Sequence, residues 1–142
     1  MSKGNTFEND LLKLIFNGTA IADIAENDAT SPLTNIRVSL HTADPGEAGS
    51  QTTNEATYGG YARVNVARTT AGWVVTGNSV SPAATISFPA ATSGTNTITH
   101  FAVGTATSGA GKVLYKGTVT PNIAVAAGVT PKLTTASAIT ED

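Results

Sequence analysis

The sequence predicts a mainly β protein: an antiparallel β-sandwich of about eight strands, jelly-roll or immunoglobulin-like, with a short N-terminal α-helix. After residue 30, short runs alternate apolar and polar residues, as half-buried strands do. Gly, Asn and Ser separate these runs at places suited to turns. The length of 142 residues suits one domain, divided into an N-terminal helix and connector at 1–30 and the β-sandwich at 31–142.

The N-terminal helix is predicted to start near Asn5 and to end at Asn17-Gly18, because Gly tolerates the left-handed conformation at a helix end. Its apolar stripe has helical spacing and consists of Phe7, Leu11, Leu14 and Ile15, while Leu12 and Phe16 broaden it. A helix of about twelve residues is marginal alone in water, so it must dock on something. Packing on its own sandwich and insertion into a neighbouring subunit are both open.

The strands follow from period-two alternation. In the segment IRVSLHT, Ile36, Val38 and Leu40 share the inward face and His41 is expected to point outward. Similar runs occur at 61–68, 72–77, 84–88, 98–106, 112–119, 122–127 and 131–137. Alternation predicts a core made of Ile36, Val38, Leu40, Val64, Val66, Trp73, Val75, Ile86, Phe88, Phe101, Val103 and Val113.

Composition favours an assembling protein. Charged residues make up only 13% of the chain, with 8 basic and 10 acidic side chains and no run of one sign, so nucleic acid is not an expected partner. No segment has the roughly 18 apolar residues of a membrane helix, and the N-terminus lacks a signal peptide's apolar region. We therefore expect synthesis in a cytoplasm and no membrane partner. The absence of cysteine excludes disulfides and thiolate chemistry.

No catalytic, cofactor-binding or metal-binding residues are predicted. The stretch GTATSGAGKV at 104–113 lacks the spacing of a phosphate-binding loop and precedes a strand. Asp44-Pro45-Gly46-Glu47 suits a turn better than a metal site. A hydrolase would need a carboxylate and a nucleophile beside His41 or His100. A carbohydrate-binding module would need exposed aromatics around residues 40–64.

Residues 43–60 form a long connection without hydrophobic period. Such a segment has few apolar anchors with which to offset its ordering entropy of roughly 1–2 kcal/mol per residue. We therefore expect contacts with other subunits to order it, together with the N-terminal helix. Asp44, Glu47 and Glu55 would face basic groups on the partner. Tyr58 and Tyr61 complete this predicted interface.

Five segments carry a resemblance to a known family: FENDLLKLIFNGTAIADIAEN, SPLTNIRVSLHTADPGEAG, TNEATYGGYARVNVART, GWVVTGNSVSPAATISFPAAT and THFAVGTATSGAGKVLYKG. The chain resembles small structural proteins of tailed bacteriophages and prophages that commonly carry the label phage tail fiber protein. SLHTADPGEAG and GYARV contribute most to the similarity, which covers almost the whole chain. The resemblance implies a non-enzymatic virion structural protein with no cofactor.

The position on the virion has two alternatives. A fibre shaft shows heptads, collagen-like triplets or repeated β units, and this chain has none of them. We therefore expect a capsid decoration or cement subunit that contacts the major capsid protein. The alternative is a tail fibre or tail-tip attachment protein, with glycan receptor binding possible in that role. In either position we expect a homo-oligomer held by other virion proteins.

Overall fold

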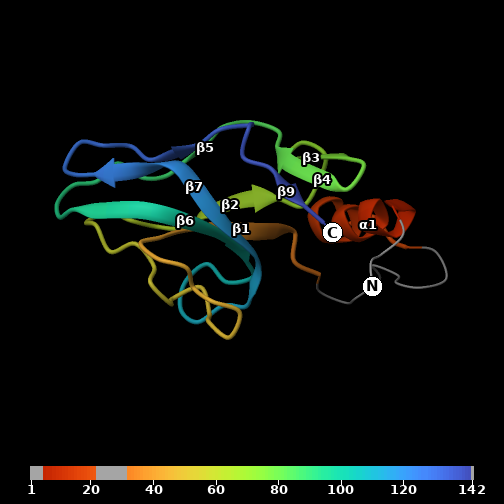
Figure 1. Cartoon of the computed structure of the whole chain (residues 1–142), viewed down its shortest axis with the longest axis horizontal. Coiled ribbons are helices and arrows are strands. Elements are labelled where there is room, and N and C mark those ends of the chain that lie inside the picture. Colours follow the sequence, from red (N-terminus) through yellow and green to blue (C-terminus); the bar gives the residue numbers. More distant parts are fainter. Residues whose placement is uncertain (1–4, 22–31, 142) are drawn as a thin grey trace. The chain divides into compact units, whose positions relative to one another are not determined.

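The computed structural model describes residues 5–21 and 32–141. The chain forms two compact units (Figure 1). Unit 1 comprises residues 1–35, 66–85 and 133–142, and unit 2 comprises residues 36–65 and 86–132. The mainly β class, with antiparallel sheets and a short N-terminal helix, is confirmed. The jelly-roll or immunoglobulin-like topology and the division at residue 30 stay predictions, and part of the connector lies outside the described residues.

The helix of unit 1 comprises α1 (Asn5–Leu12) and a single π-helical turn, η1 (Lys13–Asn17). Gly18 ends it in the left-handed conformation, with φ of 65°, and its N–H donates to the Lys13 carbonyl. The predicted stop at Asn17-Gly18 is therefore confirmed. Leu12 and Phe16 are fully buried, and the Phe16 ring meets Trp73 edge to face with centroids 4.8 Å apart.

The predicted apolar stripe of the helix is not the face that docks. Phe7 is 42% exposed, and Leu11, Leu14 and Ile15 are only half-buried. The docked face instead carries Glu8, Leu12 and Phe16, each four residues after the last. Both faces have the i, i+4 spacing of a helix, so the 3.6-residue period alone does not decide which of them docks. The helix thus packs within its own unit and leaves the predicted stripe accessible.

Arg68 fixes the end of this helix to its unit. Its guanidinium donates to the carbonyls of Ile15 at 2.7 Å and Leu14 at 2.8 Å, and to the Leu33 carbonyl at 2.7 Å. The last carbonyls of a helix have no intrahelical partner, so a cation at this position satisfies them and complements the helix dipole.

The sheet of unit 1 has the order β3-β4-β9. Its strands are β3 (Trp73–Thr76), β4 (Ser79–Pro82) and β9 (Ile139–Thr140). Thr76 pairs with Ser79 across the predicted Gly77-Asn78 turn, where Gly77 has φ of 61°. The predicted runs did not include β4 or β9.

The main sheet has the order β2-β1-β6-β7. Its strands are β1 (Asn35–His41), β2 (Val64–Ala67), β6 (Asn96–Gly104) and β7 (Val113–Val125). β1 and β6 are antiparallel, with Val38 opposite Val103 and Leu40 opposite Phe101. Unit 2 also contributes to a two-stranded sheet of β5 (Ile86–Ser87) and β8 (Lys132–Leu133).

Most of the predicted core is buried. Eight of the twelve predicted residues are at most 8% exposed: Ile36, Val38, Leu40, Trp73, Ile86, Phe88, Phe101 and Val103. The other four are half-buried: Val64, Val66, Val75 and Val113. All four lie on β2, β3 or β7, the outermost strands of their sheets. An edge strand has a neighbour on one side only, so its inward residues keep more contact with solvent.

Strand β7 merges two predicted strands. The segments at 112–119 and 122–127 form one strand that pairs with β6, with an irregularity between them. Thr118 lies opposite His100 and Ile123 lies opposite Ile98, so the four residues at 119–122 face the single residue Thr99. The two predicted strands are therefore one strand interrupted by a bulge.

Candidate functional site

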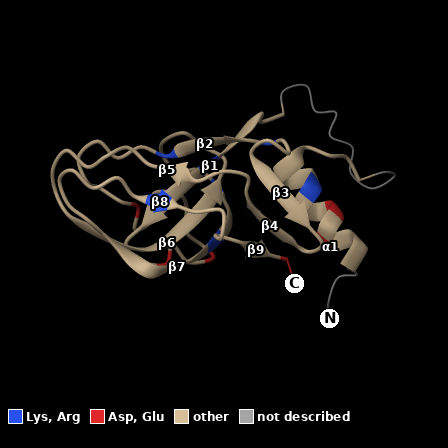
Figure 2. Cartoon of the chain, turned by 90° about the horizontal axis from the view of Figure 1, so that it is seen from above, with Lys and Arg blue, Asp and Glu red and all other residues tan. Residues whose placement is uncertain are grey.

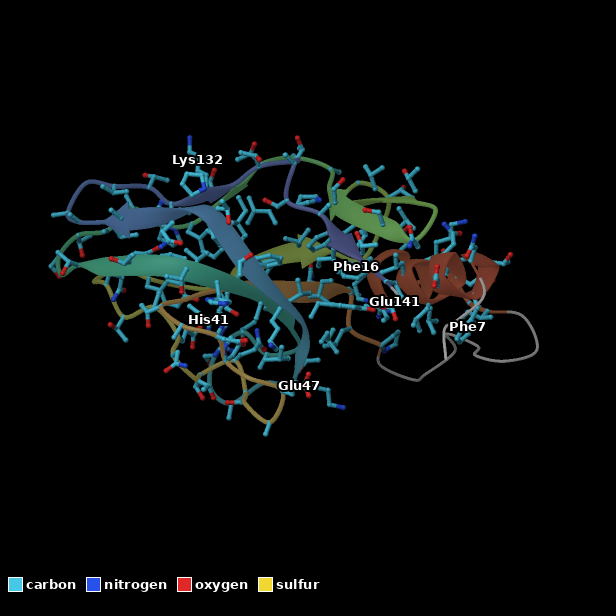
Figure 3. The ribbon with its side chains drawn as sticks, in the orientation of Figure 1. Phe7, Phe16, His41, Glu47, Lys132 and Glu141 are labelled. Carbon is cyan, nitrogen blue, oxygen red and sulfur yellow. The ribbon has the colours of Figure 1, made fainter. Side chains whose placement is uncertain are left out.

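The most elaborate polar structure lies in the long connection from β1 to β2. We call residues 42–63 the clamped loop and residues 105–111, which connect β6 to β7, the facing loop; both belong to unit 2. Backbone pairing ties them to the sheet and to each other, through bridges between His41 and Glu55 and between Ser50 and Lys112. Figure 3 marks His41 on β1 and Glu47 on the clamped loop.

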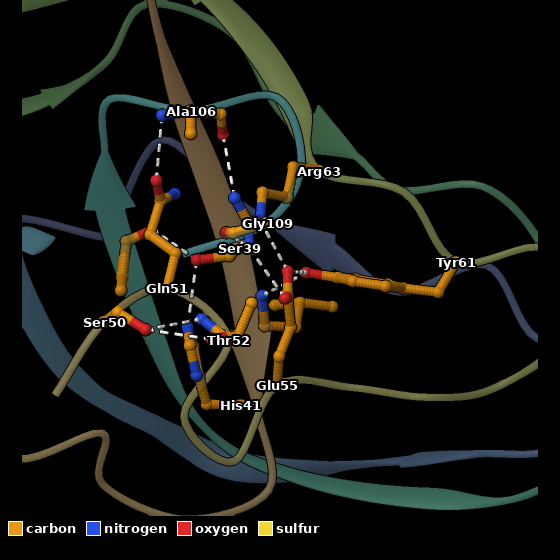
Figure 4. Close-up of polar contacts among 12 residues, drawn as sticks. Ser39, His41, Ser50, Gln51, Thr52, Glu55, Tyr61, Arg63, Ala106 and Gly109 are labelled. Atoms are coloured by element: carbon orange, nitrogen blue, oxygen red, sulfur yellow. Dashed lines mark hydrogen bonds and ion pairs between the residues drawn. The ribbon is translucent and has the colours of Figure 1, made fainter. Parts of the chain in front are cut away.

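Arg63 is the centre of this structure (Figure 4). Its side chain is 2% exposed and grips Glu55 in a bidentate pair, at 2.6 Å from Nε and 2.8 Å from the second terminal nitrogen. The same guanidinium donates to the facing loop's carbonyls at Ala106, 2.9 Å away, and Gly109, 2.8 Å away. Hydrogen bonds to Glu55 raise the pKa of Arg63 further. The planar fork thus makes four hydrogen bonds, two of which join the clamped loop to the facing loop.

Tyr61 extends the network to the sheet. Its hydroxyl donates to Glu55 Oε1 and accepts the Leu40 N–H, both at 3.0 Å. Burial raises the pKa of Tyr61 far above its usual range. The Tyr61 ring packs edge to face on Tyr58, 5.3 Å away, and stacks on Phe88, 6.5 Å away. Tyr61 therefore connects the ion pair with the apolar core.

Gln51 fastens the clamped loop from the other side. It is fully buried, its N–H donates to the Gly111 carbonyl at 2.9 Å, and its Oε1 accepts the Ala106 N–H at 3.0 Å. A Cβ atom at Gly104 or at Gly111 would lie 2.2 Å from the Gln51 side chain. Only glycine fits at these two positions while the glutamine keeps its place.

His41 corrects the sequence prediction. It was expected to point outward, but it is fully buried, as is Ser39 on the same face of β1. The clamped loop covers that face: His41 Nδ1 lies 2.8 Å from the Thr53 carbonyl, and Nε2 lies 2.9 Å from Ser39 Oγ. Alternation places a residue on one side of a strand, but it does not reveal a loop that returns to cover that side.

The clamped loop also corrects the expectation that it could not bury itself. Gln51 is 0%, Ala56 4% and Tyr58 3% exposed. Glu55, expected to face a basic group on a partner, pairs with Arg63 of its own chain. Asp44 likewise pairs with Lys116, 2.9 Å away. Polar contacts with its own unit order this loop, which a count of apolar anchors overlooks.

The remaining predicted interface residues stay accessible. Asp44 is exposed, and its Oδ1 accepts the Gly46 N–H at 2.8 Å. That hydrogen bond, followed by Lys116, lowers the pKa of Asp44. Glu47 is exposed at the next turn. Phe7 and its half-buried companions Leu11, Leu14 and Ile15 belong to unit 1 and the loop residues to unit 2. Whether either group contacts a partner stays a prediction.

The chemistry available at the loop is restricted. Ser39 and His41 are hydrogen-bonded like a nucleophile and base, but both are fully buried and no substrate could reach them in this conformation. Tyr58, a candidate for stacking on a sugar, is 3% exposed and donates to the Pro89 carbonyl at 3.1 Å. In the described ranges no group of three His, Asp or Glu side chains is placed to hold a metal ion.

Sequence reasoning named Glu55 and Tyr61 but missed Arg63 and Gln51. One signal was present for Arg63: in a chain this poor in charge, an arginine eight residues after a glutamate in the same loop is a candidate internal partner. Nothing in the sequence marks Gln51. Figure 2 colours the charged residues along the ribbon and shows how few they are among the described residues. Among the residues the structure covers, no helix is long and apolar enough to span a membrane.

Comparison with known proteins places the chain in a family. No curated protein matches it. A family model described as Podophage GP4 fiber I protein gp80 matches residues 2–140, nearly the whole chain of 142 residues. The match confirms the resemblance to phage tail fibre proteins seen in the sequence. The chain therefore belongs to the phage fibre family described as Podophage GP4 fiber I protein gp80.

Proposed function

We propose that this chain is a non-enzymatic structural protein of a tailed-phage tail fibre, either within the fibre or at its attachment. The match of residues 2–140 to a family of fibre proteins carries this proposal. It favours the tail alternative over the capsid decoration role, which rested on the lack of shaft-like repeats. A chain without repeats suits a junction, a collar or a tip better than a long shaft.

The clamped loop supports a structural role. Its polar side chains are used on one another: Arg63 on Glu55 and two carbonyls, Tyr61 on Glu55 and a β1 amide, and Gln51 on the facing loop. A catalytic site keeps polar groups free to contact a substrate, whereas these groups are engaged in hydrogen bonds and an ion pair that fix the conformation of two loops. Such a rigid surface suits a protein that must present a fixed face to neighbouring subunits.

Two surfaces are proposed to meet other virion proteins. The first is the accessible helical stripe of Phe7, Leu11, Leu14 and Ile15, which presents apolar area to solvent. The second is the outer turn of the clamped loop at Asp44 and Glu47, whose carboxylates would give register more than affinity. Tail components are the proposed partners, and copies of the chain are proposed to associate with one another.

The position on the virion is tested by labelling. Purified particles would be incubated with gold-labelled antibody against the full chain and examined by electron microscopy, and its copy number would be measured by quantitative mass spectrometry. We expect label on the tail and a copy number comparable with tail proteins. Label spread over the shell, with a copy number approaching that of the major capsid protein, would overturn the fibre proposal in favour of decoration.

The helical surface is tested by incorporation. A Phe7→Asp variant should fold but fail to enter particles, because the charge disrupts an apolar contact without disturbing the docked face. Val74→Asp is a matched control, since Val74 on β3 is also a strongly exposed apolar side chain of unit 1, at 48% against 42% for Phe7. Equal incorporation of both variants would remove the stripe from the interface.

A further inference from the structure

His41 is a buried titratable group placed where a small charge change would act on the whole clamped loop. It is the last residue of β1, and it is fully buried between the sheet and the loop. Three backbone hydrogen bonds surround it: Thr42 N–H to the Asn54 carbonyl, Ala56 N–H to the Leu40 carbonyl, and Gln51 N–H to the Gly111 carbonyl. Releasing the loop would break all three together.

The contacts of His41 define its neutral form. Nδ1 lies 2.8 Å from the Thr53 carbonyl, which can only accept, so Nδ1 carries the proton and donates. Nε2 then accepts from the Ser39 hydroxyl at 2.9 Å. The neutral imidazole is therefore fully satisfied, with one hydrogen bond to the loop and one to its own strand.

A second proton would be accommodated without breaking these bonds. The Ser39 hydroxyl lies 3.4 Å from the Ala102 carbonyl and could turn to donate there, leaving its oxygen to accept from Nε2. The cost of protonation is thus mainly the burial of a charge. Desolvation is the leading cause that lowers the pKa of His41 below its ordinary 6.5, against the raising effects of the Thr53 carbonyl and Glu55.

The charged groups around His41 do not offset this cost. Glu55 lies in the loop above but is already gripped by Arg63, whose positive charge opposes a second cation. His100, on β6, is paired with His41 in register and also disfavours its protonation. Among the described residues, Glu55, Arg63 and His100 are the titratable groups that act on His41. A protonated His41 would share its site with one arginine and one further imidazole.

We propose that His41 is an acid-sensitive contact: it holds the clamped loop on the sheet near neutral pH, and in mild acid the loop loosens. The sign follows from linkage: an exposed imidazole binds its proton more readily than the buried one, so as pH falls below about 6.5 protons favour the released loop. The stabilisation is complete above that value and is lost progressively below it. The proposal does not depend on where the protein sits on the virion.

Hydrogen exchange measured on the full chain tests whether His41 holds the clamped loop on the sheet in this way. Amide protection, corrected for intrinsic exchange rates, would be measured at pH 7.5 and pH 5.0 for Thr42, Gln51 and Ala56, with Phe101 and Ala102 of β6 as internal reference. We expect the loop amides to lose at least about threefold in protection relative to β6 on acidification. Equal loss in loop and sheet, or none in the loop, would overturn the proposal.

The two histidines of the chain provide a matched pair of variants. His41→Gln keeps an amide for the Thr53 carbonyl but cannot titrate, so loop protection should become independent of pH. His100→Gln replaces the half-buried neighbour and should leave the pH dependence in place. If His100→Gln abolished the pH dependence and His41→Gln left it in place, the pH-sensitive residue would be His100 and the proposal would be wrong.

Titration by NMR keeps the proposal falsifiable if His41→Gln does not fold. The imidazole shifts of His41 and His100 would be followed in the wild-type chain, together with the loop amides. We expect the loop amides to change with the midpoint of His41. A His41 midpoint at or above the ordinary value, or loop amides that follow His100 alone, would overturn the proposal.

Discussion

Replacing Arg63 by Ala removes the centre of the clamped loop. The side chain is 2% exposed and makes two hydrogen bonds to Glu55 and one to each of two facing-loop carbonyls. Removing one partner of a buried ion pair costs about 3–5 kcal/mol, because the other charge is left without compensation. We expect the free energy of unfolding to fall by this amount, measured by urea denaturation followed by far-ultraviolet circular dichroism.

A double-mutant cycle separates the pair from its surroundings. Arg63→Ala combined with Glu55→Ala should be less destabilised than the sum of the single variants, by about 0.5–3 kcal/mol, because the second change removes the orphaned charge. Lys112→Ala is the control: this lysine is exposed in the same region, so its loss should stay within about 0.5 kcal/mol. If Arg63→Ala were as mild as the control, the clamp would not contribute to stability.

Three further predictions concern other parts of the fold. Leu12→Ala should lower the free energy of unfolding by about 2–5 kcal/mol, because Leu12 is fully buried. Phe7→Ala should lower it by under about 1 kcal/mol, because Phe7 is 42% exposed. Equal losses of the two variants in urea denaturation would show that the face assignment is wrong. Gly104→Ala should destabilise the protein by about 1–3 kcal/mol, because the added methyl group clashes with Gln51. Adding Gln51→Ala to this variant should recover part of the lost stability in thermal melts. If no stability were recovered, the loss would have a cause other than the clash with Gln51. The Gly46 N–H, and after it Lys116, lowers the pKa of Asp44 below its ordinary value of 3.8. The stabilisation from Asp44 is therefore present above pH 3.8 and is lost as the pH falls below that value. An NMR titration in which the pKa of Asp44 is not lowered would refute the pairing with Lys116.

Periodicity in the sequence was a good guide to which apolar residues of a strand face the core. It identified β1, β3 and β6 and most of their buried residues, and turn chemistry located the Gly18 helix end and the Gly77 turn. It could not place edge-strand valines correctly, because alternation does not reveal a strand's position in its sheet. The two-residue strand β9 lay outside every predicted run.

The clamped loop shows why the site was harder to predict. Its order comes from hydrogen bonds between partners far apart in sequence, such as Arg63 and the Ala106 carbonyl, 43 residues away. A single sequence gives no information on which carbonyl a distant arginine will meet. The same loop buries His41, so one unpredicted fold-back reversed the orientation expected for the histidine and the partners expected for Glu55.

The bulge in β7 has a consequence for copies held close together. β7 is the outermost strand of its sheet, and at thirteen residues it is long for an edge, which makes it a template for aggregation by strand addition. Residues 119–122 leave the regular ladder, and Pro121 has no N–H to offer an incoming strand. Regular pairing of a second chain along this edge would therefore be interrupted after Thr118. This interruption opposes edge-to-edge pairing of crowded copies into one continuous sheet.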